Sequence, residues 1–166
     1  MTPNPVVIGA AQSAWAAECL AEERDVHHLI VMDHYDLVGE VCRCDLRAAR
    51  AGEPVTRCMH SPPVTVEDQQ TAEDALGIMA ERHVGCLPVV DWMGALHGIV
   101  TLRDLRRAGI VSQELAHACA ACGATHDLVP VREDEQVMFC RHCVEQCRTP
   151  VGATSDVYYY VDGGGD

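Results

Sequence analysis

Two pairs of cysteines near the carboxyl end have the spacing of metal ligands. Cys119 and Cys122 are followed, after 17 intervening residues, by Cys140 and Cys143. Four thiolates in this pattern can surround one zinc ion as a tetrahedron, each about 2.3 Å from the metal. Because four protein ligands leave no coordination position open, the pattern predicts a structural zinc site rather than a catalytic one.

Other thiols and imidazoles leave alternatives open. Four nearby side chains could replace one zinc ligand, although we expect them to have surface or packing roles: Cys147, His117, His126 and His142. Without metal this segment has too few apolar residues for a core, and we expect chelators to unfold it. The other cysteines are expected to be small buried residues, with metal binding or a redox switch as the alternative for the Cys42–Cys44 pair: Cys19, Cys42, Cys44, Cys58 and Cys86.

A second set of chemical groups stands where an apolar strand runs into a short helix. Thr101 offers a hydroxyl beside the free N–H groups of the helix start, which together suit a phosphate oxygen. Asp104, three positions later, can accept both hydroxyls of a ribose, and Arg103 can neutralise phosphate charge. The same Thr-x-x-Asp pattern is also close to a helix capping box, so both interpretations stand at this point.

An internal repeat organises the first two thirds of the chain. Shifting the sequence by 58 residues aligns residues 1–33 with 59–91 and gives 12 identities, and a shift of 59 adds seven more from Leu37 to Ala49. So many identities in one register indicate two copies of one supersecondary unit. Neither copy is large enough to bury both faces of its small sheet, so the two are expected to pack together.

Each copy is expected to consist of a strand, a helix, a pair of strands and a last short helix. Ala72, Ala75, Leu76 and Met79 follow the spacing of one helix face. The strand pairs are rich in Val, Ile and Leu around an Asp-containing turn, as in hairpins. The predicted elements are Val6–Ile8, Gln12–Glu23, His28–Met32, Leu37–Val41 and a helix after Asp45, then Val64–Val66, Thr71–Arg82, Leu87–Val90, Leu96–Thr101 and a helix after Asp104.

Composition and charge exclude several function classes. The 166 residues include 12 basic and 25 acidic side chains, a net charge of −13, and every basic residue is an arginine. The absence of lysine excludes a lysine Schiff base and a lysine-bearing phosphate loop, and the acidic surplus disfavours nucleic acid. With no apolar run near 20 residues and no signal-like start, we expect a cytoplasmic protein without membrane contact. No catalytic constellation appears, so enzymatic activity is not expected.

Several motifs in the second copy resemble the CBS (cystathionine-β-synthase-like) domain. These are Leu87–Asp91, Gly98–Leu105 and the opening Met-x-x-x-Pro-Val that both copies share. The resemblance implies an α+β fold of two β-α-β-β-α repeats in a pseudo-two-fold disc, which usually dimerises with another disc. It also implies a regulatory module that binds AMP, ATP or S-adenosylmethionine. The expected boundaries are 1–57 and 58–110 for the repeats, 111–148 for a helix (near Val111–Ala118) and zinc knuckle, and 149–166 for a tail.

The resemblance also implies which residues meet the nucleotide. Thr101 and Asp104 of one copy would face a base held against the other copy, with Arg103 as a weaker candidate; the remaining expected contacts are Ile99, Thr2, Val7, Val26, His27 and His28. The mirror cleft keeps Asp45 but has Cys42, a weak donor, in place of the hydroxyl, and Glu40 adds repulsion near phosphate. Its base side would be His60, Thr65 and Val84–Cys86. We therefore expect the Thr101 cleft to bind and the Cys42 cleft to be empty or weaker.

The cysteine spacing is similar to the zinc finger of TraR/DksA-type transcription regulators and to zinc ribbons. From Val111 onward the sequence has three basic and nine acidic residues, whereas a zinc ribbon that binds DNA would be basic. A knuckle that is purely structural or contacts a protein partner is therefore the preferred interpretation. Two alternatives to the nucleotide sensor remain: a module that only dimerises and docks a protein, and a transcription regulator that acts through the knuckle.

Overall fold

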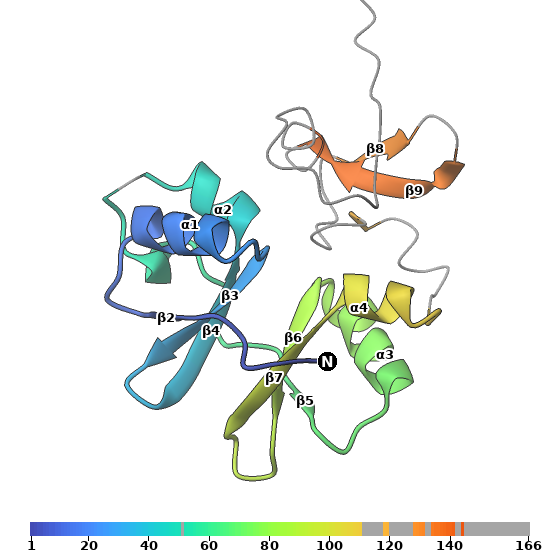
Figure 1. Ribbon diagram of the computed structural model, residues 1–166, viewed down its shortest axis with the longest axis horizontal. Coiled ribbons are helices and arrows are strands. Elements are labelled where there is room, and N and C mark those ends of the chain that lie inside the picture. Colours follow the sequence, from blue (N-terminus) through green and yellow to red (C-terminus); the bar gives the residue numbers. More distant parts are fainter. Residues whose placement is uncertain (51, 111–117, 120–127, 132–133, 142–143, 145–166) are drawn as a thin grey trace, which may run out of the picture.

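The fold consists of two similar α/β halves and a small C-terminal hairpin (Figure 1). The computed structural model describes residues 1–50, 52–110, 118–119, 128–131, 134–141 and 144. Among these residues, no helix is both long and apolar enough to cross a bilayer.

The first half of the fold, repeat 1, contains a three-stranded sheet and two helices. Its elements are β2 (Val7–Gly9), α1 (Ala14–Glu23), β3 (His28–Asp33), β4 (Asp36–Cys42) and α2 (Arg43–Ala48). β2 runs parallel to β3, and β4 returns antiparallel as a hairpin. This order confirms the predicted β-α-β-β-α unit.

The second half, repeat 2, has the same order of elements. They are β5 (Val66–Glu67), α3 (Ala72–Arg82), β6 (Cys86–Val90), β7 (Leu96–Thr101) and α4 (Leu102–Arg107), with a 3-10 turn (Val55–Arg57) between the repeats. The predicted bounds hold to within one or two residues. The last helices are the exception: α2 and α4 begin before Asp45 and Asp104 rather than after them, because the residue at position 42 or 101 is the N-cap.

The first residues of each repeat pair with a strand in the sheet of the other repeat. β1 (Thr2–Pro3) pairs with β7, so the second sheet has the order β1-β7-β6-β5, with Thr2 opposite Ile99. In the same way His60, at the start of repeat 2, forms a bridge with Glu40 on β4. The exchange, which the sequence did not indicate, joins the two halves through backbone hydrogen bonds.

Two glycines in matching positions of the repeats permit this exchange. A Cβ atom on Gly98 would lie 2.9 Å from the carbonyl oxygen of Thr2, and one on Gly39 would lie 2.6 Å from that of His60. Real Cβ atoms do not approach backbone this closely, so any side chain would push the incoming strand away. Gly39 and Gly98 are also identical in the repeat alignment, which gives that identity a physical reason.

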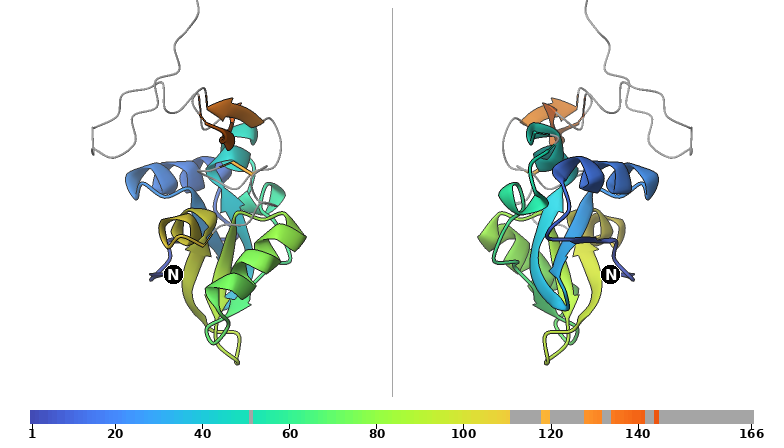
Figure 2. Two further views of the ribbon diagram at one scale, coloured as in Figure 1. Left: turned by 90° about the vertical axis from the view of Figure 1, so that its right-hand side faces the viewer. Right: turned by 90° about the vertical axis from the view of Figure 1, so that its left-hand side faces the viewer.

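Apolar clusters stabilise each repeat and join the two repeats. One lies under the helices of each repeat, and the third joins the two sheets through Ile30, Cys86 and Ile99, with Met32, Leu37 and Leu96 beside them. The third cluster draws on both repeats, which confirms that the copies pack on one another. Side views show the helices on the outer faces of the two sheets (Figure 2).

The C-terminal segment forms a β-hairpin that the sequence analysis did not predict. β8 (Leu128–Val131) and β9 (Asp134–Cys140) are antiparallel, and the hairpin lies beside α2 (Figures 1 and 2). Cys119 and Cys140 are buried. Several predicted features lie outside the described residues: Cys122, Cys143, Cys147, His117, His126, His142, most of the predicted helix near Val111–Ala118, and the tail.

Candidate nucleotide-binding clefts

Thr101 and Asp104 form a complete capping box at the start of α4. The Thr101 hydroxyl donates to Asp104 Oδ2 at 2.7 Å, and the Thr101 backbone N–H donates to the same oxygen at 2.9 Å. The Asp104 N–H in turn donates to Thr101 Oγ1 at 3.2 Å. The structure therefore shows the capping role, which fixes both side chains where β7 becomes α4.

The capping box leaves one side of the aspartate available. Both hydrogen bonds that the carboxylate accepts reach Oδ2. No hydrogen bond from the described part of the chain reaches Asp104 Oδ1. Asp104 is half-buried, so this oxygen can still accept a hydrogen bond from a ligand hydroxyl. Arg103, the next residue back, is exposed. Capping and ligand contact are therefore compatible at this carboxylate.

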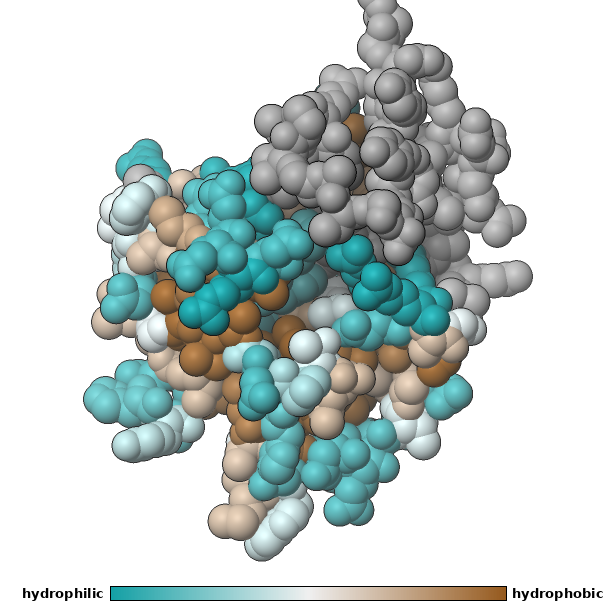
Figure 3. All heavy atoms as spheres, viewed as in Figure 1, coloured by the Kyte–Doolittle hydropathy of each residue, from teal (hydrophilic) through white to brown (hydrophobic). Residues whose placement is uncertain are grey.

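The residues expected on the base side come from three separate elements. Thr2 is placed next to β7 by its pairing with Ile99, and it is exposed. Val7 is 48 % exposed on β2, where apolar residues reach the surface of repeat 1 (Figure 3). Val26 and His27 are half-buried and His28 is buried at the start of β3. The structure thus brings Thr2 to the strand that ends at Thr101, whereas Val7 and residues 26–28 lie on or beside the strands of repeat 1.

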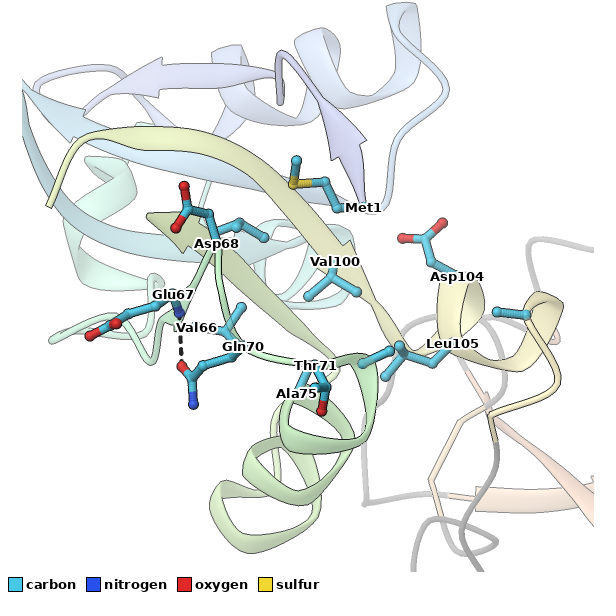
Figure 4. Close-up of a pocket in the computed structure, with 13 residues that line it drawn as sticks. Met1, Val66, Glu67, Asp68, Gln70, Thr71, Ala75, Val100, Asp104 and Leu105 are labelled. Atoms are coloured by element: carbon cyan, nitrogen blue, oxygen red, sulfur yellow. Dashed lines mark hydrogen bonds between the residues drawn. The ribbon is translucent and has the colours of Figure 1, made fainter. Parts of the chain in front are cut away.

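A cavity of about 200 Å³ adjoins Asp104 on the helix side of the repeat 2 sheet (Figure 4). Its walls are apolar and come from β5, β6, β7, α3, α4 and the first residue: Met1, Val66, Val89, Val100 and Leu105 are among them. Its polar lining includes Glu67, Asp68 and Asp104 and no basic side chain. Sequence reasoning missed this cavity, because it arises from the distance between α3 and α4 and not from a motif.

The mirror cleft in repeat 1 is occupied by its own side chains. Cys42 caps α2: its thiol donates to Asp45 Oδ2 at 3.1 Å and accepts from the Asp45 N–H at 3.4 Å. His60 Nε2 lies 3.3 Å from the same carboxylate oxygen. Although burial acts to raise the pKa of Asp45, the hydrogen bonds from His60 and Cys42 outweigh it and lower that pKa. The hydrogen bond to Asp45 raises the pKa of His60, so the pair is ionised over a wider pH range.

Glu40 is the most unusual side chain of this cleft. It is only 3 % exposed, and its Oε2 has no hydrogen-bond partner among the described residues. Burial raises the pKa of Glu40 to about 7, against a smaller opposing effect of His60. Glu40 and Cys42 also add to the burial that raises the pKa of the Cys86 thiol well above its usual value. A phosphate approaching here would meet acidic groups and a filled interior.

The zinc prediction rests on cysteines of which only two are described. Cys119 and Cys140 pack in one small cluster with Leu128, Phe139 and Cys44 of α2. Within the described residues, no group of three or more His, Cys, Asp or Glu side chains is arranged to hold a metal ion. Of the five other cysteines only Cys86 is buried; the expectation of buried residues is wrong for Cys19, which is exposed, because it lies on the outer face of α1.

Comparison with known proteins identifies the two repeats. A family model described as CBS domain matches residues 1–52 and 55–111. The crystal structure of CBSX2 in complex with AMP is 33 % identical, with a TM-score of 0.59, and the match covers 66 % of this chain and 92 % of that one. The cytosolic domain of the Mg²⁺ channel MgtE in complex with ATP is 27 % identical, with a TM-score of 0.58, over 65 % of this chain and 46 % of that one.

Curated relatives match over the same region. An inosine-5'-monophosphate dehydrogenase of Nitrosopumilus maritimus is 29 % identical over 106 residues, which are 63 % of this chain and 22 % of that enzyme. An uncharacterized 17.7 kDa protein of Acidianus ambivalens is 30 % identical over 64 % of this chain and 63 % of its own length. The chain thus spans about a fifth of the dehydrogenase and corresponds to only a part of it.

Proposed function

Because the chain belongs to the CBS domain family, we propose that it is a regulatory module that binds an adenosine nucleotide between its two repeats. The similar CBS-pair structures named above were solved with AMP and with ATP, which supports a ligand of this class. Ligand binding would change the shape or assembly of the module rather than drive a reaction. S-adenosylmethionine remains in the proposed ligand class.

We place the ligand at the Thr101 cleft. Asp104 Oδ1 is the observation that carries this assignment, because the carboxylate is held rigidly by the capping box while one oxygen stays available for the ribose hydroxyls. Thr101 and the exposed Arg103 would contact phosphate, and Thr2, Ile99, Val7 and residues 26–28 would surround the base. In repeat 1, Cys42 and Asp45 form the weaker site.

Isothermal titration calorimetry with AMP, ATP, S-adenosylmethionine and NAD tests the proposal, and the chain supplies a matched control. Thr71 and Asp74 form a second capping box with nearly the same distances: 2.9 Å, 2.8 Å and 3.1 Å. Both Asp104→Ala and Asp74→Ala remove a helix cap, but only Asp104→Ala should weaken binding. Equal affinities of the two variants for the best ligand would contradict the assignment of Asp104.

We also propose a structural zinc site in the C-terminal segment, with Cys119, Cys122, Cys140 and Cys143 as ligands. The spacing of the two Cys-x-x-Cys pairs and the burial of Cys119 and Cys140 support it. Elemental analysis should find one zinc ion per chain, and removal of the metal by a chelator should unfold the hairpin while leaving the two repeats folded. A chain that contains no zinc, with an unchanged hairpin, would contradict this site.

A homodimer is the proposed assembly, in line with the pairing of discs that the family resemblance implies. The chain presents large apolar side chains at its surface, among them Trp15 at 60 % exposure on α1. Sedimentation of the purified chain with and without nucleotide should give the mass of two chains and show whether the ligand changes it.

One observation favours a second candidate, an interaction module that binds no nucleotide. The Thr101 hydroxyl donates to Asp104 Oδ2, and the Asp104 N–H donates back to Thr101 Oγ1. Such reciprocal bonding is expected of groups with a purely structural role. The hairpin turns of both repeats also expose large side chains: Tyr35 is 96 % exposed, and Trp92 is 81 % exposed. Thermal shift distinguishes the candidates, because no stabilisation by any adenosine ligand would support the interaction module.

A further inference from the structure

Two thiols far apart in the sequence meet where the C-terminal hairpin lies on repeat 1. Cys44 Sγ on α2 is 3.9 Å from Cys140 Sγ at the end of β9, although 96 positions separate them. We propose that Cys44 and Cys140 form a redox-sensitive pair, which a hydroperoxide converts into a disulfide that fastens the hairpin to repeat 1.

The distance is compatible with bond formation. A disulfide needs its sulfurs about 2.05 Å apart, so the two atoms must approach by about 2 Å. Rotation of one or both side chains about χ1 moves a sulfur by this order of distance without any change of fold. Cys44, Leu128 and Phe139 all pack against the small cluster that contains Cys140, so the two thiols share one packed environment.

The two thiols differ in exposure in the way that a reactive and a resolving cysteine do. Cys44 is half-buried, so a small oxidant can reach it from solvent, whereas Cys140 is only 3 % exposed. Oxidation is selective for accessible thiolates. Cys44 is therefore the first residue to react, and Cys140 is the thiol that resolves the product.

The chemistry balances with hydrogen peroxide as the oxidant. The Cys44 thiolate attacks one peroxide oxygen, the O–O bond breaks, and a sulfenic acid and hydroxide form. The Cys140 sulfur then attacks the Cys44 sulfur, the S–O bond breaks, and water leaves with the proton of Cys140. Two thiols are oxidised in total, one peroxide is reduced to two waters, and a dithiol reverses the step.

The disulfide would have consequences for both ends of the molecule. It would close a loop that contains all of repeat 2, and long closed loops restrict the unfolded chain most. On the repeat side, Cys44 lies two residues after Cys42 and immediately before Asp45, so the hairpin would be fixed to the helix that carries the repeat 1 cleft. Cys140 is also a ligand of the proposed zinc site, so in a zinc-loaded chain the disulfide would form only as Cys140 leaves the metal, whereas in a metal-free chain the pair forms without that step.

Peptide mapping of the full chain after hydrogen peroxide treatment tests the pair. Trypsin cleaves after arginine and releases residues 44–47 and 133–141, each with a single cysteine, apart from Cys42 and Cys143. We expect these two peptides to be joined under non-reducing conditions, with a loss of two hydrogens, in the wild type and in Cys19→Ser. In Cys44→Ser the link should disappear and the thermal midpoint should no longer rise on oxidation.

Two results would overturn the proposal. One is peptide 44–47 recovered with a free thiol while other cysteines are oxidised; the other is a midpoint that rises equally in Cys44→Ser and the wild type. Zinc is measured on the same samples before peroxide is added. A missing metal with an intact 44–47 to 133–141 link would contradict only the zinc site, and bound metal without the link would contradict only the thiol pair.

Discussion

The two clefts of this molecule share one backbone design but differ in the side chains that fill it. In both, the last residue of a strand caps a six-residue helix and bonds to an aspartate three positions later. In both aspartates these bonds reach Oδ2 and leave Oδ1 available, but repeat 2 uses the Thr101 hydroxyl, whereas repeat 1 uses the Cys42 thiol and adds His60 at the same oxygen of Asp45. Both copies thus have the helix cap, while the side chains around it differ.

The strand exchange explains how two differences between the repeats act together. Thr2 pairs with Ile99 in one cleft, and His60 pairs with Glu40 in the other, so the matching positions face matching surroundings. The Thr101 cleft therefore has a neutral pair, Thr2 and Ile99, at these positions. The Cys42 cleft has an ionisable pair, His60 and Glu40. The comparison teaches that the position of the backbone and the chemistry of the site can evolve separately.

The largest effect that the comparison predicts is the difference between the two aspartates. Asp104→Ala should weaken adenosine nucleotide binding about ten- to 100-fold, because hydrogen bonds to a charged group contribute about 1.5–3 kcal/mol each. Asp45→Ala should change the affinity less than about twofold, because the weak donor Cys42 and the buried Glu40 disfavour a phosphate beside that carboxylate. Calorimetry on both variants measures this, and equal losses would refute the asymmetry.

A gain of binding in repeat 1 would sharpen the comparison further. The triple variant Glu40→Ile, Cys42→Thr, His60→Thr copies the residues of the Thr101 cleft into matching positions. It should raise the number of ligands bound per chain from one to two in the same calorimetric titration. Circular dichroism melting confirms that the variant is folded, and an unchanged stoichiometry in a folded variant would show that these three residues do not decide binding.

Glu40 should make stability depend on pH. Because burial raises its pKa from 4.5 to about 7, the folded state holds a proton that the unfolded state has lost between these values. The free energy of unfolding should therefore fall as pH rises from 4.5 to 7, by about 1–3 kcal/mol. Glu40→Gln should flatten this decrease in urea titrations at several pH values, and a variant with the wild-type slope would contradict the assignment.

Two neighbouring groups titrate in other ranges. The lowered pKa of Asp45 affects stability only below pH 3.8, where the stabilising charge is lost as pH falls. The raised pKa of His60 adds stability that is fully present below pH 6.5 and is lost as pH rises through the folded value. Measurements between pH 4.5 and 6.5 therefore isolate the contribution of Glu40.

The smallest expected effect is that of His60. Its side chain is 63 % exposed, and solvent screens an ion pair of this kind, so His60→Ala should lower the free energy of unfolding by less than about 1 kcal/mol at pH 6. Urea titration in low and high salt measures the effect, which should shrink as salt increases. A loss several times larger would mean that His60 also supports the strand exchange.

Local patterns predicted most of the fold. Apolar spacing and turn residues indicated the helices and strands of both repeats to within a few residues, because these signals act over a few positions in the chain. They missed β1 because a two-residue strand has no periodicity and its partner lies about 97 positions away. They also missed the hairpin of β8 and β9, whose residues were interpreted only as a metal-binding segment.

Taken by itself, the sequence determined the duplication, the helices and strands of the two repeats apart from β1, and the Thr-x-x-Asp pattern that is compatible with a cap, since each depends on neighbours in the chain. Only the tertiary structure decided that Glu40 is buried, that Asp45 faces His60, and that Cys44 meets Cys140. Burial and charge pairing depend on which distant segments share a space, and the packing of two sheets and the exchange of their first strands set that space.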